Sequence, residues 1–160
     1  MASLKGVTLA RMVDVSVSTD GVTYTTLSGV KNWEPKIKSD TDDITTHDTD
    51  GVTVMMPIAA EFTVDFELVQ AFNTNATPYT RDAGQLILLS AGQEFGNAAL
   101  LYFKVAHKDA THYDGELTFP AYVTFDSNGG GEGATKISGT LQLTERPTGT
   151  GVWDKTFGAQ

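Results

Sequence analysis

The chain has 160 residues, of which 40% are hydrophobic and 19% charged; this composition fits one folded domain with a sizeable core and excludes global disorder. With 20 acidic and 11 basic residues its formal net charge is −9, so its surface repels polyanions. This excludes a sequence-reading DNA-binding protein, which needs Lys and Arg to displace counterions from phosphates.

Cysteine is absent, which excludes a disulfide scaffold and a thiolate zinc site. The N-terminal residues MASLKGVTLARMV lack the basic and apolar regions of a signal peptide. No apolar run approaches the roughly 20 residues of a membrane helix. We therefore expect a soluble protein made in a reducing compartment.

Alternation of apolar and polar residues with a period of two predicts strands along most of the chain. Residues 12–17 place three valines on one face, and an Asp-Gly turn joins them to a second strand over 22–27. A third extended segment is expected over 30–38, where Pro35 favours an edge strand or a bulge.

The clearest strand is 59–68, and three further strands are expected over 100–107, 116–125 and 135–145. In 59–68 the apolar face carries Phe62, Val64, Phe66 and Leu68, and the polar face carries Glu61, Thr63, Asp65 and Glu67. In 135–145 Ile137, Leu141 and Leu143 lie opposite Ser138, Thr140, Gln142 and Thr144. Six to eight such strands predict antiparallel sheets, packed as a sandwich or closed as a barrel.

Residues 82–92 break this pattern and predict one helix. Asp82 as N-cap with Gln85 three residues later forms a capping-box pattern, and Gly92 supplies the stop. The expected buried face consists of Ala83, Leu86, Ile87, Leu89 and Ala91.

No internal repeat or linker divides the chain, so we expect a single domain over 1–160. We expect an N-terminal arm over about 1–10 and a Gly-rich hairpin tip over 126–134. A loosely held C-terminal tail is expected over about 146–160, where apolar periodicity is weak.

Residues 39–51, SDTDDITTHDTDG, gather five aspartates and four threonines. An EF-hand loop with Gly51 at its sixth position would need carboxylates at the first and twelfth, where Thr46 and Pro57 stand. The sequence therefore disfavours an EF-hand, although an irregular calcium site stays open.

Other candidates for chemistry are weaker. His107 and His112 are not spaced as known metal ligands, and a solvated turn is favoured there. No G-x-S-x-G nucleophile elbow is present. Carboxylates two apart on a strand, such as Asp65 and Glu67, lie roughly 6.5–7 Å apart, which glycosidase chemistry allows. We expect instead that these carboxylates lie on the side of the strand that faces water.

Several segments, taken in their order, resemble the tail tube (major tail) proteins of long-tailed bacteriophages. They are an N-terminal strand pair, a Trp33-containing strand running into KSDTDDITTHDTDG and ending in VTVMMP, the strand 59–68, a helix opening with Asp82-Ala-Gly-Gln85, and GTLQLTERPTG at 139–149. The resemblance covers about residues 10–149. It departs from the family at Val52, where an aromatic often follows the Asp-Gly turn.

This resemblance implies an antiparallel β-sandwich with one α-helix and no catalysis or cofactor. Subunits would form hexameric rings that stack into a tube, with one sheet of each contributing to an inner oligomeric β-barrel through which DNA passes without specific binding. Other tail proteins (tape measure, tail terminator and distal tail) would be partners. The protein would be made in the host bacterial cytoplasm and would reside in the virion tail.

The resemblance also gives the polar residues candidate roles. Candidate lumen-lining residues are Glu61, Thr63, Asp65, Glu67, Thr140 and Gln142. Candidate inter-subunit or inter-ring residues are Asp40, Asp42, Asp43, Asp48 and Asp50. A mostly negative lumen would repel the phosphates of passing DNA. The alternative is a capsid decoration or surface adhesion module, a fixed small oligomer; an enzyme or carbohydrate-binding domain lacks a recognisable site.

Overall fold

The computed structural model describes residues 13–128, 136–154 and 157. Their main feature is an antiparallel sheet of eight strands in the order β2-β1-β7-β8-β9-β4-β3, with β10 paired to β8. The strands are β1 (Val13–Ser18), β2 (Thr25–Thr26), β3 (Val30–Asp43), β4 (Met55–Val69), β7 (Leu100–His107), β8 (Leu117–Asn128), β9 (Lys136–Leu143) and β10 (Thr148–Gly149). A small hairpin is formed by β5 (Phe72–Asn73) and β6 (Thr80–Arg81).

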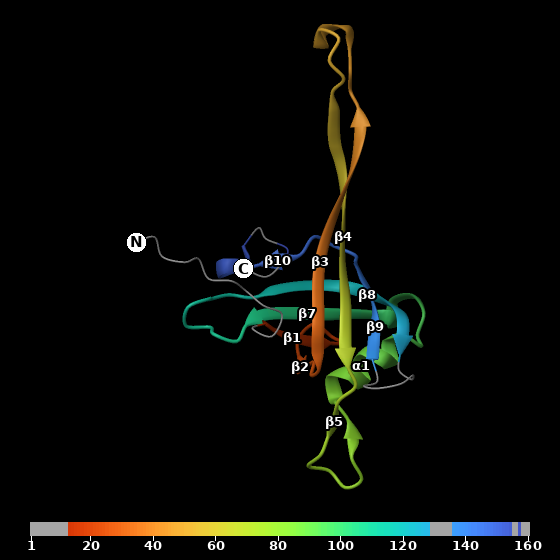
Figure 1. The fold of residues 1–160 in the computed structure, drawn as a ribbon, viewed down its shortest axis with the longest axis vertical. Helices are drawn as coiled ribbons and strands as arrows, with labels where there is room; N and C mark the ends of the chain where they lie inside the picture. The colour runs from red at the N-terminus through yellow and green to blue at the C-terminus, as the bar shows by residue number, and fades with distance from the viewer. Residues whose placement is uncertain (1–12, 129–135, 155–156, 158–160) are drawn as a thin grey trace.

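This sheet bends so that its two halves become the layers of a sandwich. In Figure 1 β3 and β4 stand upright across the nearly horizontal β7 and β8. The core lies between these layers, where Trp33 on β3 packs on Phe103 of β7 with ring centroids 6.3 Å apart. The mainly β, antiparallel fold is confirmed, and the strands follow from alternation: β7, for example, buries every second residue.

The hairpin of β3 and β4 is much longer than the sequence predicts. Instead of strands over 30–38 and 59–68, the structure has strands of 14 and 15 residues. Figure 1 shows the hairpin extending far beyond the body; we call residues 39–60 the arm. Almost every arm residue is exposed on both faces, so the alternation that marks a half-buried strand is missing there.

The single α-helix among the described residues, α1 (Ala83–Ala91), packs against β1, β2, β7 and β8. Asp82 caps it as predicted, since its carboxylate accepts a hydrogen bond from the Gln85 amide. The predicted buried face of the helix is wrong, because it is displaced by about one residue along the sequence. Of the predicted residues only Ala91 is buried. The buried residues are Gly84, Gln85, Leu88 and Ala91.

Helix α1 ends at Ala91 with Gly92 as its C-cap, as the sequence predicts. Gly92 has an ordinary right-handed conformation, so left-handed backbone freedom is not its role. A Cβ at Gly92 would overlap the ring of Phe125 on β8, so the missing side chain allows helix and sheet to approach.

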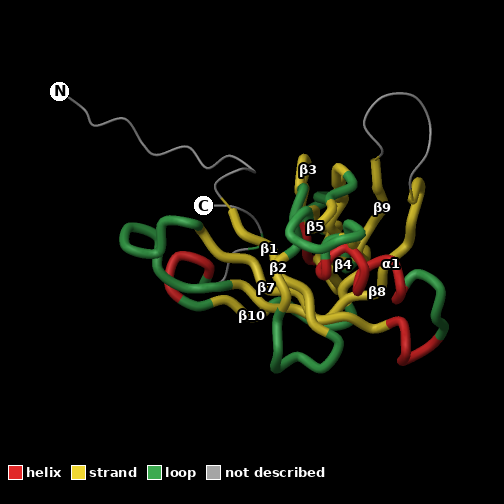
Figure 2. Tube along the Cα trace, turned by 90° about the horizontal axis from the view of Figure 1, so that it is seen from below, coloured by secondary structure: helices red, strands yellow, loops and turns green. Residues whose placement is uncertain are grey.

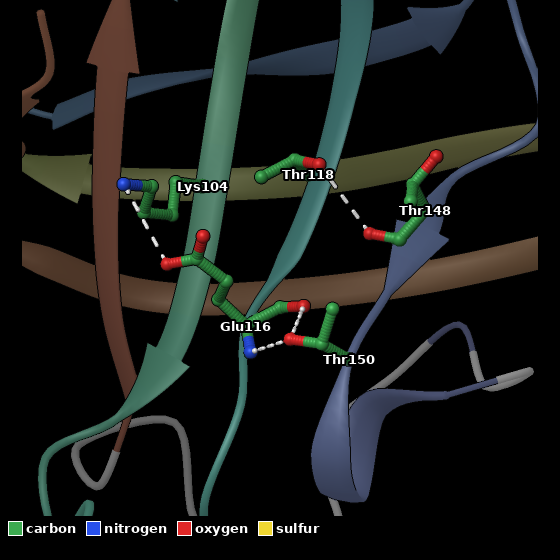
Figure 3. Close-up of polar contacts among 5 residues, drawn as sticks. All are labelled: Lys104, Glu116, Thr118, Thr148 and Thr150. Atoms are coloured by element: carbon green, nitrogen blue, oxygen red, sulfur yellow. Dashed lines mark hydrogen bonds and ion pairs between the residues drawn. The ribbon is translucent and has the colours of Figure 1, made fainter. Parts of the chain in front are cut away.

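The expectation of a loose tail over 146–160 is corrected in its described part. Strand β10 pairs with the start of β8, and a 3-10 turn (Gly151–Trp153) places Trp153 in the core with 1% exposure. Figure 3 shows side-chain contacts that hold β10 on β8: the Thr150 hydroxyl accepts from the Glu116 amide (3.1 Å) and donates to its carbonyl (3.4 Å), and the Thr118 hydroxyl donates to the Thr148 carbonyl (3.4 Å). The expected N-terminal arm over 1–10 and most of the glycine-rich segment lie outside the described residues.

Candidate assembly surfaces

The six residues that the sequence assigns to a lumen lie together on one face of β4 and β9. Thr63 pairs with Gln142 and Asp65 with Thr140 in the strand register, and Glu61 and Glu67 lie two residues to either side on β4. The Thr140 hydroxyl donates to Asp65 at 2.9 Å. We call this surface the polar face; the opposite side of the same strands carries core residues such as Val64 and Leu141.

Lysines on the flanking strands compensate the carboxylates of the polar face. Lys36 contacts Asp65 at 2.5 Å, and this contact, followed by the Thr140 hydroxyl, lowers the pKa of Asp65. Glu67 lies 3.3 Å from Lys136 and 3.5 Å from Lys31; the hydrogen bond from Lys136 is the main reason that the pKa of Glu67 is lowered.

The polar face is therefore charge-balanced and not acidic. Its carboxylates are Glu34, Glu61, Asp65 and Glu67, and its lysines are Lys31, Lys36, Lys38 and Lys136, with Lys38 opposite Glu61 in the register. Over this part of the sheet, up to Lys38 on β3, four negative and four positive charges sum to zero; Asp40, opposite Ala59, continues the same face into the arm. This corrects the picture of a mostly negative surface, because the sequence pattern of β4 alone gave no signal of the lysines that would lie beside it.

The five candidate inter-subunit aspartates are spread along the arm. Asp40, Asp42 and Asp43 lie on β3, Asp48 lies in a 3-10 turn at the tip, and Asp50 adopts a left-handed conformation beside Gly51. They do not converge: no group of three or more His, Asp or Glu side chains suited to a metal ion occurs among the described residues.

The aspartates and threonines of this stretch shape the tip of the arm. The Asp43 carboxylate accepts a hydrogen bond from the Thr45 amide at 2.8 Å, and the side-chain and backbone hydrogen bonds of Thr45 lower the pKa of Asp43. The Thr45 hydroxyl in turn accepts from the Val54 amide at 2.8 Å. These bonds close the loop between β3 and β4, which is one answer to why both residue types gather there.

The arm also carries a set of exposed apolar residues that the sequence reasoning missed. They are Ile44, Val52, Met55, Met56 and Ile58, each 43–61% exposed. A register shift between Asp40 and Thr41 leaves Ile58 unpaired as a bulge on β4, so the apolar residues beyond it do not continue the core-facing row of Phe62 and Val64 by strict alternation. The run VTVMMPIAA was the available signal, because it is apolar without a polar alternate face.

Two free strand edges lie at the two ends of the β3-β4-β9-β8 unit in the described part of the chain. β3 pairs only with β4, and residues 123–128 of β8 pair only with β9. A free edge presents unpaired backbone N–H and C=O groups that another strand can bind. Pro35 lies on β3, as expected for an edge strand.

The histidines do not form a site. His107 is buried at the end of β7 and stacks on Tyr113 and Trp153, with ring centroids 4.4 and 5.2 Å away. His112 pairs with Asp109 at 2.7 Å in the exposed loop that follows. The expected solvated turn is thus correct for His112 and wrong for His107, which belongs to the core.

No family model matches the sequence, and no curated protein matches it. Among solved structures, a chain of the SPP1 tail tube matches with a TM-score of 0.64 and 15% identity, over 89% of this chain and 78% of that one. The tail of an empty gene transfer agent particle, refined with C6 symmetry, matches with a TM-score of 0.61 and 14% identity, over 90% of this chain and 99% of that one. The chain has the fold of a tail tube protein.

The tail tube fold recurs in a baseplate. A chain of the anti-feeding prophage baseplate matches with a TM-score of 0.56 and 7% identity, over 93% of this chain and 99% of that one. Among the residues that the structure describes, no helix is long and apolar enough to cross a membrane.

Proposed function

We propose that this chain is the structural subunit of a phage tail tube, assembling into hexameric rings that stack to form a conduit for DNA ejection. The observation that carries the proposal is the arm. Its apolar residues lie beyond the body, where no second layer of the described part of the chain covers them (Figure 1). Exposed apolar surface of this extent marks a site of protein–protein contact.

Within this proposal the arm connects successive rings. The arm combines aspartates, which stay hydrated, with exposed apolar side chains such as Met56 and Ile58, which favour burial against another subunit. The candidate residues Asp40, Asp42, Asp43, Asp48 and Asp50 then border the contact and restrict its geometry.

The two free strand edges support closure of a ring. Strands β3, β4, β9 and β8 are successive antiparallel neighbours. Because this unit has an even number of strands, β3 of one copy can pair with β8 of the next and keep the alternation all round the ring. A closed barrel of this kind leaves no edge exposed to aggregation.

The polar face would line the lumen of such a barrel, since the opposite side of the same strands is filled by the core. Glu61, Thr63, Asp65, Glu67, Thr140 and Gln142 would then contact the hydrated DNA. A charge-balanced surface neither binds phosphates strongly nor repels them from the wall.

The wider setting follows from the same proposal. The tube would meet other tail proteins at its ends and inside it: a tail terminator, a distal tail protein and a tape measure. The subunit would be made in the host bacterial cytoplasm and reside in the virion tail. Catalysis and a bound cofactor have no place in this role.

Negative-stain electron microscopy of the purified protein, over a series of concentrations, tests the proposal. We expect hollow tubes or stacked rings with a central pore. Ile58→Asp should abolish or shorten the tubes because it places a charge in the arm contact, while its Tm should stay that of the parent, since Ile58 is 60% exposed in the monomer.

Val22→Asp is the matched control, because Val22 is 83% exposed in the turn between β1 and β2, away from the arm. Tubes formed equally by Ile58→Asp and Val22→Asp would contradict the role of the arm. Uniform small particles at every concentration would favour the alternative, a capsid decoration or surface adhesion module.

A further inference from the structure

Phe95 is the most exposed large apolar residue of the described chain, with 91% of its surface accessible. It follows α1 in a segment held by two backbone hydrogen bonds, from Gln93 to Ser90 (3.2 Å) and from Glu94 to Ala91 (3.1 Å). Figure 2 shows this segment looping at the margin of the sheet. The segment is thus ordered by backbone hydrogen bonds up to Glu94, and the ring of Phe95 is left exposed to solvent.

A groove of about 490 Å³ lies at the base of the arm. Its apolar lining includes Ile37 of β3, Phe62 of β4, Pro147 and Phe157. Arg146 and Asp154 supply its charged groups. Ile37 is 56% exposed, so the groove is an apolar depression open to a partner.

The free strand edges place Phe95 and this groove on the same side of a joined sheet. Gly92 lies against Phe125, whose ring packs edge-on against Phe66 in the core, so the segment that carries Phe95 lies on the core side of the free β8 edge. Ile37 lies opposite Phe62 in the register and therefore on the core side of the free β3 edge. Pairing of these edges between two copies brings the two features to one seam.

Charge supports the same pairing. Glu94 precedes Phe95, and Arg146 lies in the groove. Neither makes an ion pair with a residue that the structure describes. Asp154 also lines the groove, so a ligand with one negative charge beside its ring must approach from the Arg146 side.

We propose that Phe95 of one copy inserts into the groove at the base of the arm of its lateral neighbour, with Glu94 pairing with Arg146. The occupant is thus a second copy of this chain, and the contact locks the seam between β3 and β8 from the core side. This inference rests on the proposed ring assembly and specifies which residues join one subunit to the next.

Cysteine crosslinking tests the contact directly, because the native chain has no cysteine. Single variants Phe95→Cys and Ile37→Cys are mixed, assembled and oxidised, and a disulfide forms only when the two Cβ atoms lie within about 4.5 Å of each other. We expect a disulfide-linked dimer from this pair and none from Val22→Cys with Ile37→Cys. Electron microscopy of the same samples records tube formation independently.

The outcomes separate the two proposals. If tubes form without the Phe95–Ile37 crosslink, the proposed contact of Phe95 with the groove is wrong, and the proposed tube function still stands. The crosslink without tubes supports the lateral contact and counts against the tube. Neither tubes nor crosslink overturns both.

A charge exchange provides a second test that does not depend on disulfide geometry. Glu94→Arg or Arg146→Glu alone should reduce the yield of rings several-fold by placing like charges at the seam. The double variant should recover most of that yield. A double variant that assembles no better than the weaker single variant would overturn the Glu94–Arg146 pairing.

Discussion

At the residue scale, Gln85 shows how a polar side chain becomes part of a core. It is fully buried, and its amide group donates to the carbonyls of Ser28 (2.8 Å) and Val69 (2.9 Å) and accepts from the Ala71 amide (3.0 Å). The side chain therefore satisfies backbone groups at the start of β3 and the end of β4. The capping-box pattern identifies the residue but not this role, because in such a box the side chain returns to its own helix.

Gln85→Leu should lower the free energy of unfolding by about 3 kcal/mol or more, because it leaves three buried backbone groups without partners at about 1–3 kcal/mol each. Chemical denaturation measures the change. Leu86→Ala, at the neighbouring exposed position of α1, should stay within about 0.5 kcal/mol of the parent. A loss below 1 kcal/mol for Gln85→Leu would show that water replaces the amide.

At the scale of elements, Lys36 and Thr140 join β3 and β9 to Asp65 of β4 in between. Both contacts favour the charged carboxylate, so the pKa of Asp65 is lower in the folded protein than in the unfolded chain. The resulting stabilisation is present above the unfolded pKa of about 4 and is lost as the pH falls through the folded pKa.

Asp65→Asn should flatten the dependence of unfolding free energy on pH below about pH 4, because the variant has no such proton to take up. Its effect near pH 7 should be small, within the roughly 0–1 kcal/mol of a solvent-exposed pair. Urea titrations from pH 2.5 to 7 measure both. Lys36→Met should partly reduce the same dependence of unfolding free energy on pH. If this dependence is unchanged in both variants, the stabilising contact between Lys36 and Asp65 is contradicted.

At the scale of the whole molecule, the proposed assembly would use separate surfaces: the arm, the polar face and the free edges. The arm points along the long axis in Figure 1, whereas β3 and β8 are the two end strands of the β3-β4-β9-β8 order within the body. Contacts along and across the axis can therefore form independently. This separation is what a tube built from stacked rings requires, and it keeps the polar face out of both contacts.

Glu61→Lys with Asp65→Lys tests the position of the polar face. The change leaves two carboxylates against six lysines, a face of charge +4 in place of zero. If this face lines a narrow lumen, assembled variant tubes should retain short double-stranded DNA in a strongly salt-dependent manner, because focused positive potential binds phosphates. Cosedimentation of labelled DNA with the tubes measures the retention.

Asp109→Lys with Asp114→Lys carries the same change of charge on the loop between β7 and β8, and both residues are exposed. This control should retain much less DNA. Equal retention by the two variants would mean that overall charge, and not a lumen, decides the result.

The sequence by itself determined the features that depend on local pattern. The period-two strands, the capped helix at Asp82 and the shared face of Glu61, Thr63, Asp65 and Glu67 all follow from backbone geometry acting over a few residues. The order of these elements was also enough to suggest the tail tube fold, which the solved structures support.

The tertiary structure decided what depends on neighbours distant in the chain. Lys36 and Lys136 neutralise the polar face only because β3 and β9 flank β4, and Trp153 anchors the tail only because β10 pairs with β8. The length of the arm was hidden because alternation indicates a half-buried strand, and the arm is exposed on both faces. Charge balance, burial and exposure are properties of the assembled sheet, so no single strand encodes them.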